Sequence, residues 1–308
     1  MLSGLSVLIP VYRSAPILPE LAARLAKTLP ALATNFEVLM VCDGSPDDSW
    51  TVIKSLSSQY PFIKGFNLNK NYGQHNALLA AIRAAKYDVI VTMDDDLQHP
   101  PEEIQKLLQK LGEGPDVVYG TSAELQHSFA RNLSSMAVKY VMQQLMGHEN
   151  ARKISAFRAF RTELRNSFAD YRDRFVNIDI LLTWATSRFS SVDVAIHPRH
   201  SGVSGYNVRK LLLHAINLVT AFSSLPLQVA SLVGFLFMLL GVLIFLYVIA
   251  NYMIHGGTVP GFTFIASMIA IFSGVQLFSL GIIGEYISRI HFRSMGQPYG
   301  IVRETTDD

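Results

Sequence analysis

No lysine, arginine, aspartate or glutamate occurs between Lys210 and Glu285, and this absence constrains the fold more than any other feature of the sequence. Two apolar stretches, Leu227–Ala250 and Phe262–Gly284, lie within this window. Each is longer than the ~20 residues that an α-helix needs to cross a bilayer. A large buried hairpin is the alternative, but uncharged stretches of this length rarely form one. We therefore predict two transmembrane helices.

The residues that flank these stretches predict their orientation. Arg209 and Lys210 precede the first stretch and Arg289 and Arg293 follow the second, whereas the connector 251–261 contains no lysine or arginine. Because cytoplasmic flanks are enriched in lysine and arginine, we expect both termini to be cytoplasmic. The protein is then a multi-pass protein of the inner (plasma) membrane with its N-terminal domain in the cytoplasm.

The segment Asn207–Ser224 has a wide apolar stripe at helical spacing, with Arg209 and Lys210 away from that stripe. This pattern is typical of an interfacial amphipathic helix that lies on the inner leaflet, and a packed linker helix is the alternative. The expected parts are a cytoplasmic domain at 1–206, the interfacial helix at 207–224, a transmembrane hairpin at 225–285 and a cytoplasmic tail at 286–308.

Upstream of the membrane segments, short β-branched runs alternate with helical periodicity. We expect strands at Leu5–Tyr12, Phe36–Asp43, Phe62–Leu68, Asp88–Met93 and Asp116–Tyr119. We expect helices at Ala15–Leu32, Gln74–Ala85 and Glu102–Leu111, and another that Ser45 caps with Pro46 in its first position. Strands and helices that alternate at this spacing predict an α/β fold with a mostly parallel sheet.

Three consecutive carboxylates, Asp94, Asp95 and Asp96, end the fourth of these strands. Side chains at positions i and i+2 of an extended backbone point the same way, so Asp94 and Asp96 can share a cation and Gln98 can add an oxygen. Such an oxygen-only set suits Mg²⁺ or Mn²⁺. A solvated acidic turn is the alternative, although a buried strand does not usually end in three like charges without a counter-ion.

The chain lacks both common phosphate-binding motifs, a Gly-x-Gly-x-x-Gly after the first strand and a Gly-Lys-Ser/Thr loop. A nucleotide site can still be built if Asp43 accepts hydrogen bonds from the base or ribose and a metal neutralises a diphosphate. The net charge of +2 implies no binding to nucleic acid, and the single cysteine, Cys42, excludes an internal disulfide framework.

Several segments together resemble glycosyltransferase family 2, namely Ser6–Tyr12, Asp43–Asp47, Asn71–Ala77 and Asp94–Glu102. Towards the C-terminus, Arg199–Tyr206, the paired apolar stretches and Gly284–Ile290 resemble the polyprenyl-phosphate glycosyltransferases. That group includes dolichyl-phosphate mannose synthases and bacterial undecaprenyl-phosphate glycosyltransferases. The resemblance covers nearly the whole chain and implies a Rossmann-like GT-A catalytic domain.

The resemblance also implies roles for individual residues. The base and ribose of a nucleotide sugar are expected at Pro10, Tyr12 and Asp43, with Asp95 against the sugar nucleotide and the metal on Asp94, Asp96 and Gln98. Arg131 and Ser135 correspond to acceptor-phosphate contacts, and Arg199 and Ser204 to residues that close over the donor or acceptor phosphates.

The chain departs from the family pattern at two places. Gly120-Thr121-Ser122 lacks an arginine that often follows the fifth strand, and Lys153–Arg158 lacks the aspartate proposed elsewhere as a catalytic base. A phosphate acceptor with a second pKa of ~6 has almost no proton to lose, so cations that bring two anions together matter more. Candidates are Arg131, Lys153 and Arg158. For Lys153 and Arg158 the alternatives are a solvated basic patch or contacts with anionic lipid headgroups.

The function expected from the sequence is an inverting, metal-dependent transfer of one sugar to polyprenyl phosphate at the cytoplasmic leaflet, for modification of cell-envelope glycans such as lipopolysaccharide. By analogy with bacterial two-span members, a UDP-sugar is the expected donor. The family also includes homo-oligomers. The alternatives are a processive or protein-directed transferase and a catalytically lapsed scaffold that binds nucleotide sugar or membrane partners.

Overall fold

The structure is a computed structural model that describes residues 1–121, 154–173, 175–197, 220, 223–255, 261–296 and 300–307. It forms two compact units, which we call the sheet unit (1–212 with 297–308) and the hairpin unit (213–296). Predictions that fall outside the described residues concern most of Asn207–Ser224 and the site residues Arg131, Ser135, Lys153, Arg199 and Ser204.

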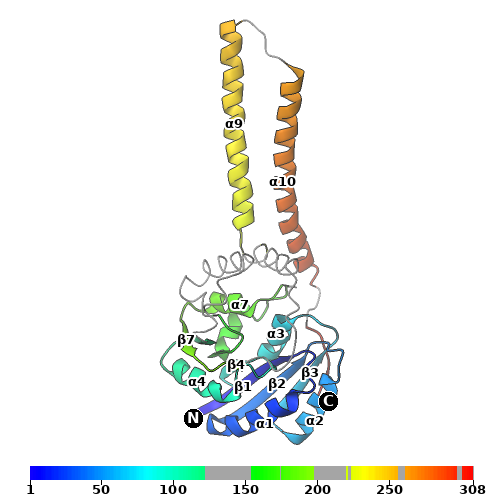
Figure 1. The fold of residues 1–308 in the computed structure, drawn as a ribbon, viewed down its shortest axis with the longest axis vertical. Coiled ribbons are helices and arrows are strands. Elements are labelled where there is room, and N and C mark those ends of the chain that lie inside the picture. The colour runs from blue at the N-terminus through cyan, green and yellow to red at the C-terminus, as the bar shows by residue number, and fades with distance from the viewer. Residues whose placement is uncertain are drawn as a thin grey trace. The chain divides into compact units, whose positions relative to one another are not determined.

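The sheet unit alternates strands and helices along the chain, as the sequence predicts (Figure 1). Its first half contains β1 (Leu2–Val11), α1 (Leu18–Thr28), β2 (Ala33–Cys42), α2 (Ser49–Gln59), β3 (Ile63–Leu68), α3 (Gln74–Ala84) and β4 (Val89–Thr92). Its second half contains α4 (Ile104–Gly112), β5 (Val117–Thr121), β6 (Arg158–Arg161), α7 (Ile178–Ala185), β7 (Phe189–Asp193) and β8 (Val302–Thr305).

The described strands form one mixed sheet in the order β7-β5-β6-β4-β1-β2-β3-β8. The central strands β4, β1, β2 and β3 are parallel, and β5 is parallel to β7. The α/β prediction is confirmed, but β6 runs antiparallel to β4 and β5, and β8 runs antiparallel to β3. The carboxyl ends of β1, β2, β3 and β4 therefore meet at one edge of the sheet, where ligands bind in open α/β folds.

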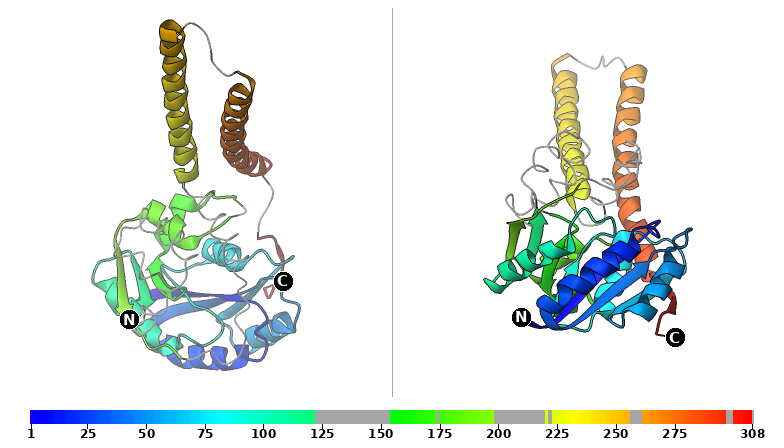
Figure 2. Two further views of the ribbon diagram at one scale, coloured as in Figure 1. Left: turned by 45° about the horizontal axis from the view of Figure 1, so that its top comes forward. Right: turned by 60° about the horizontal axis from the view of Figure 1, so that its bottom comes forward.

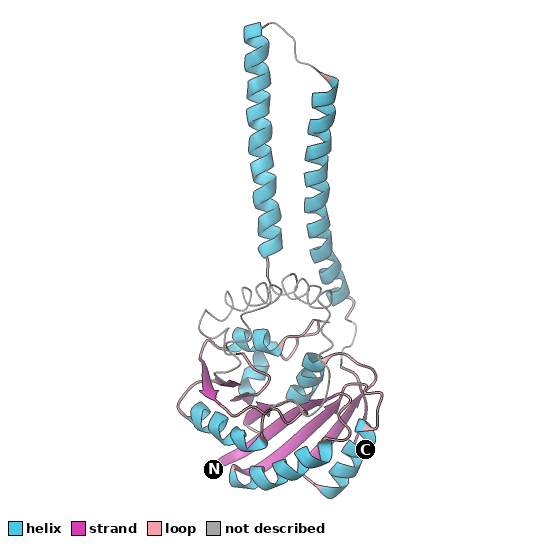
Figure 3. Ribbon diagram, viewed as in Figure 1, coloured by secondary structure: helices cyan, strands magenta, loops and turns pink. Residues whose placement is uncertain are grey.

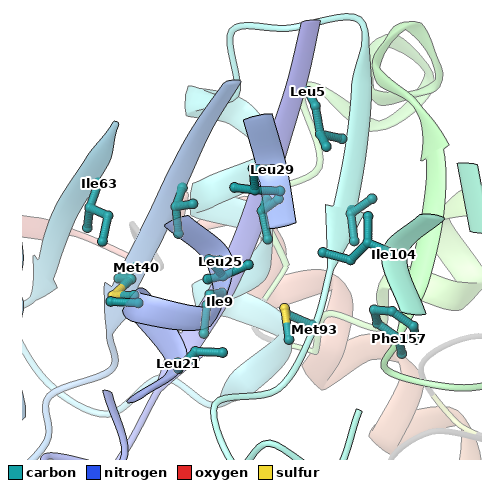
Figure 4. Close-up of a cluster of buried hydrophobic side chains, with 14 of the residues drawn as sticks. Leu5, Ile9, Leu21, Leu25, Leu29, Met40, Ile63, Met93, Ile104 and Phe157 are labelled. Atoms are coloured by element: carbon teal, nitrogen blue, oxygen red, sulfur yellow. The ribbon is translucent and has the colours of Figure 1, made fainter. Parts of the chain in front are cut away.

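Helices cover both faces of the sheet (Figure 2). One buried cluster joins α1, α2 and α4 to the sheet and includes Leu5, Val7, Ile9 and Val11 of β1 (Figure 4). Because successive strand residues point to opposite faces, the intervening buried Leu8 faces the other side, where α3 packs against β1 and β2. Apolar burial on both faces explains why these strands read as continuous β-branched runs.

The prediction that Ser45 caps the second helix is wrong. Helix α2 begins at Ser49 with Asp48 as its N-cap residue. The Ser45 hydroxyl instead donates to Asp47 Oδ1 at 2.5 Å and accepts from the Arg13 N–H at 2.8 Å. The Ser45–Asp47 pair therefore ties the end of β1 to the turn after β2, and the helix starts one turn later.

The C-terminal tail forms the edge strand β8, which the sequence predicted only as a partly extended segment. Thr306 and Gly65 exchange two hydrogen bonds, and Lys64 pairs with Asp307 at 2.5 Å. Gly65 leaves room for the tail, because a Cβ at this position would lie 2.8 Å from Thr306 Cγ2. The tail therefore completes the sheet beside β3.

The hairpin unit contains two long helices, α9 (Leu225–His255) and α10 (Phe262–Ser294) (Figure 3). Within them, Leu225–Ile254 and Ile271–Ser294 are long and apolar enough to cross a membrane. The two helices contact one another, and Phe237 packs edge-on against Phe272. Helix α10 continues past Glu285 to Ser294, and an Arg289–Glu285 ion pair at 2.8 Å spans one turn of this extension.

Candidate functional site

A pocket of about 260 Å³ opens at the carboxyl ends of the central parallel strands. Four carboxylates face it, and no lysine or arginine is among the described residues that line it. The lining residues are Pro10, Val11, Tyr12, Asp43, Asn71, Gly73, Gln74, Asp94, Asp95 and Asp96. The structure thus brings together every described residue to which the sequence assigned a nucleotide or metal role, except Gln98.

The acidic turn, as we call Asp94–Asp96, lies beyond the end of β4 and does not continue the extended strand. Strand β4 ends at Thr92, Asp95 and Asp96 form a turn, and Leu97 has a φ of 56°. Asp96 Oδ1 accepts the Gln98 N–H at 3.1 Å, which closes this turn. Side chains therefore do not alternate from Asp94 to Gln98 as they would on an extended strand. Asp94 and Asp96 line the pocket and Gln98 does not, so Gln98 as a third metal ligand stays a prediction.

Asp95 lies against the end of β1. Its Oδ2 accepts the Tyr12 N–H at 3.2 Å, and the Ser14 hydroxyl also bonds to this carboxylate. Burial raises the pKa of Asp95 above its usual range, although these hydrogen bonds act in the opposite direction. Asp95 therefore connects the acidic turn to the side of the pocket that Tyr12 lines.

Asp43 holds the loop that forms the opposite wall. Its Oδ1 accepts the Tyr72 N–H at 2.7 Å and its Oδ2 accepts the Gly73 N–H at 2.8 Å. Burial raises its pKa, and these two bonds partly offset that effect. Gly44 permits the close approach, since it has a φ of 56° and a Cβ there would lie 2.4 Å from the Lys70 carbonyl carbon. Both Asp43 oxygens therefore already bind main chain.

Arg158 lies inside the protein, with 1% of its side chain exposed. Its Nε donates to Thr92 Oγ1 at 3.0 Å, and its guanidinium pairs with Asp179, which is also buried. Tyr119 donates to the same Asp179 oxygen at 3.0 Å, and burial together with Asp179 raises the pKa of this phenol well above its usual range. This network, with Asp94 among the charges that act on Arg158, lies directly behind the acidic turn.

The pocket residues fit a hard divalent cation through their donor chemistry. Asp94 and Asp96 offer carboxylate oxygens within one turn, as Mg²⁺ and Mn²⁺ prefer. Among the described residues, no three histidine, cysteine, aspartate or glutamate side chains are arranged as a complete metal cage. A cation here would thus take its remaining ligands from water and substrate phosphate, as Mg²⁺ commonly does.

Some residues that line the pocket received no role from the sequence. Asn71 and Gly73 belong to a segment on which the family resemblance rests, yet only the structure shows that they form a wall. Gln74 follows them and donates from Nε2 to Asp94 Oδ1 at 2.6 Å. The signal in the sequence that could have identified Gln74 as a pocket residue was its position directly after the Asn-x-Gly turn.

Comparison with known proteins finds two matching families. Residues 6–168 match Glycosyl transferase family 2, and residues 225–290 match the GtrB C-terminal hairpin. The first region contains the whole pocket and the second contains α9 and most of α10.

Curated relatives match almost the full chain. The undecaprenyl-phosphate 4-deoxy-4-formamido-L-arabinose transferase of Shewanella sediminis is 32% identical over 97% of this chain and 91% of its own length. The protein of the same name from Pseudomonas aeruginosa (strain LESB58) is 33% identical over 95% of this chain and 87% of its own length.

Solved structures share the fold. Mannosyl-3-phosphoglycerate synthase from Rubrobacter xylanophilus matches with a TM-score of 0.52 at 16% identity, covering 71% of this chain and 72% of its own. Glucosyl-3-phosphoglycerate synthase from Mycobacterium tuberculosis matches with a TM-score of 0.51 at 16% identity, covering 71% of this chain and 78% of its own. These likenesses identify the sheet unit as a GT-A fold.

Proposed function

Because the chain belongs to glycosyltransferase family 2, among its polyprenyl-phosphate sugar transferases, we propose that it transfers one sugar from a UDP-sugar to undecaprenyl phosphate with inversion at the anomeric carbon. The relatives' names make 4-deoxy-4-formamido-L-arabinose the first sugar to test. The single observation that carries the metal-dependent part of this proposal is the charge of the pocket.

Four carboxylates and no described basic side chain line that pocket, so the charged side chains that a diphosphate would meet among the described residues all carry its own sign of charge. Asp94 and Asp96 are the residues that would hold Mg²⁺ or Mn²⁺ in it. Such an ion, when bound, supplies positive charge that stabilises a departing nucleoside diphosphate. The solved M. tuberculosis synthase of the same fold is a complex with Mn²⁺ and uridine-diphosphate-glucose, which supports the same donor chemistry here.

The protein's own residues position the donor. Tyr12 and Pro10 form one wall of the pocket, and the loop held by Asp43 forms the other. Since both Asp43 oxygens already accept main-chain N–H groups, we assign its main role to shaping this wall. Any further contact with a base or ribose would use remaining lone pairs of the same carboxylate.

The acceptor phosphate attacks the anomeric carbon from the side opposite to the nucleotide, which gives inversion. Its second pKa of ~6 leaves it largely ionised, so no strong base is needed. Three expectations from the sequence remain part of the proposal: acceptor-phosphate contacts at Arg131 and Ser135, a cation at Lys153, and closure over the donor or acceptor phosphates by Arg199 and Ser204. Arg158 contributes from behind the pocket, because its guanidinium is buried against Asp179 and not available to a lipid phosphate.

The membrane part of the proposal rests on the apolar helices. Two helices of this length, together with the match of residues 225–290 to the GtrB C-terminal hairpin, indicate a membrane protein. Because Arg209 and Lys210 precede the spans and Arg289 and Arg293 follow them, we propose that both termini and the sheet unit are cytoplasmic.

Cysteine labelling tests this orientation. A Gly257→Cys variant, with the new thiol in the connector 251–261, should react with a membrane-impermeant maleimide from outside the inner membrane. The native Cys42 is buried and should not contribute to the reaction. Reaction only after the membrane is permeabilised would reverse the orientation.

Donor binding to the purified, detergent-solubilised chain tests the site. Isothermal titration with UDP should show binding that requires Mn²⁺ or Mg²⁺. The Asp96→Asn variant should lose most of the affinity for UDP, and added metal should no longer change the affinity that remains. Gln105→Met, an exposed change on α4, should bind as the wild type does. Equal UDP affinity with and without metal would refute the metal role. Binding without later sugar transfer would favour the lapsed scaffold.

A further inference from the structure

Gln74 contacts the acidic turn from the opposite wall of the pocket. Its Nε2 donates to Asp94 Oδ1 at 2.6 Å, a short bond of the kind that forms between a donor and an ionised carboxylate. Asp94 is one of the two carboxylates proposed to hold the cation. A bond to one of its oxygens limits rotation of the whole carboxylate group.

The structure holds Gln74 in place through its neighbours. Gly73, with a φ of 91°, turns the chain into α3, and Gln74 is the first residue of that helix. Asp43 binds the N–H groups of Tyr72 and Gly73, and at the start of the same loop the Asn69 N–H donates to the Ile301 carbonyl at 3.0 Å. The amide therefore projects from a wall that is anchored at both ends.

The chemistry of an amide suits this position. Asp94, Asp95 and Asp96 repel one another when all are ionised, and a donor on Asp94 offsets part of that repulsion. A lysine would do so with a full charge that competes with a metal cation, whereas glutamine donates a hydrogen bond and stays neutral. Residues that orient metal ligands in this way commonly affect metal affinity without touching the metal.

We propose that Gln74 is a positioning residue, whose amide holds the Asp94 carboxylate in the orientation that binds the divalent cation. The inference rests on the proposed function, because it assigns a task within the metal site. It adds a residue from α3 to a site that the sequence placed wholly on the turn after β4.

The test is Mn²⁺ binding, followed by the electron paramagnetic resonance signal of free Mn²⁺, in full-length protein with saturating UDP. Gln74→Met removes the donor and keeps the side-chain length, and Gln74→Leu is a second donor-free variant. Gln105→Met is the matched control, since Gln105 is an exposed helical glutamine on α4. Loss of a bond to a metal ligand typically weakens binding about 10- to 100-fold, and we expect both Gln74 variants to fall in this range.

A second readout separates positioning from general damage. Excess Mn²⁺ should restore the transfer rate of Gln74→Met, and its melting temperature without metal should match that of Gln105→Met. Wild-type Mn²⁺ affinity in both Gln74 variants would overturn the inference, and so would a rate that excess Mn²⁺ fails to restore. Failure of the wild-type protein to bind Mn²⁺ in the presence of UDP would instead contradict the proposed function.

Discussion

The sequence predicts that the Arg158 guanidinium acts on the reacting phosphates, whereas its burial indicates that it stabilises the fold. Replacing Arg158 with methionine tests which of these two roles it has. Arg158 is 1% exposed and Asp179 is 7% exposed by side chain, so the change leaves a buried carboxylate without its counter-ion. It also removes the bond to Thr92, which holds the last residue of β4 before the acidic turn.

The expected loss follows from that burial. Breaking one side of a buried ion pair costs about 3–5 kcal/mol. For a unit of roughly 150–250 residues, each kcal/mol corresponds to about 2–4 °C, so the melting temperature should fall by about 6–20 °C. Arg161→Met is the control on the same strand, because Arg161 is 43% exposed and its contact with Asp116 is 3.8 Å long. Exposed pairs of this kind contribute about 0–1 kcal/mol.

Differential scanning fluorimetry of the detergent-solubilised proteins measures both variants. The double variant Arg158→Met with Asp179→Leu should recover much of the loss, since replacing a whole buried pair by apolar groups is often neutral. If Arg158→Met melts as the wild type does while sugar transfer is lost, Arg158 acts on the substrate, and the structural interpretation is refuted.

Two further predictions follow from the pocket and from the tail. The melting temperature of Asp95→Asn should rise relative to that of the wild type as the pH rises above the ordinary aspartate pKa of about 4. Burial raises the pKa of Asp95 in the folded state, so the wild type loses stability as the pH rises through that raised pKa and the carboxylate ionises, whereas asparagine stays neutral. A difference that does not change with pH would contradict this. A chain that ends at Gly296 should melt lower and bind UDP more weakly, because the Asn69 N–H loses its acceptor and β3 becomes an exposed edge. Asp307→Asn, which breaks only the half-exposed pair with Lys64, should leave both properties nearly unchanged, and a large effect would show that the ion pair rather than the strand holds the tail.

The central strands could be predicted from the sequence because each is buried on both faces. β1, β2 and β4 are apolar runs whose burial needs no information from distant residues. By contrast, β6 is the four-residue segment Arg158–Arg161, which resembles a solvated basic patch until Asp179 supplies a buried partner. β8 contains Arg303 and Glu304 and pairs with β3 from the far end of the chain, so no local pattern reveals it.

The candidate site could also be predicted in part. Strand ends identified Asp43 and the acidic turn, because parallel strands deliver their carboxyl ends to one edge. The choice of Gln98 as a metal ligand depended on an extended backbone, and the turn at Leu97 breaks that alternation, so Gln98 does not line the pocket and its role stays a prediction. The Asn-x-Gly turn before Gln74 was a signal for the position, but the contact of Gln74 with Asp94 could not be predicted, because it depends on how Asp43 holds the loop before α3.

The most direct test of the account is the appearance of a sugar on the lipid. Purified protein would be incubated with UDP-4-deoxy-4-formamido-L-arabinose, undecaprenyl phosphate and Mn²⁺, and the lipid extract analysed by mass spectrometry beside that of Asp96→Asn. We expect undecaprenyl phosphate carrying one sugar, with UDP released in equal amount, and neither product from the variant. Release of UDP without a glycosylated lipid, or equal product from Asp96→Asn, would contradict it.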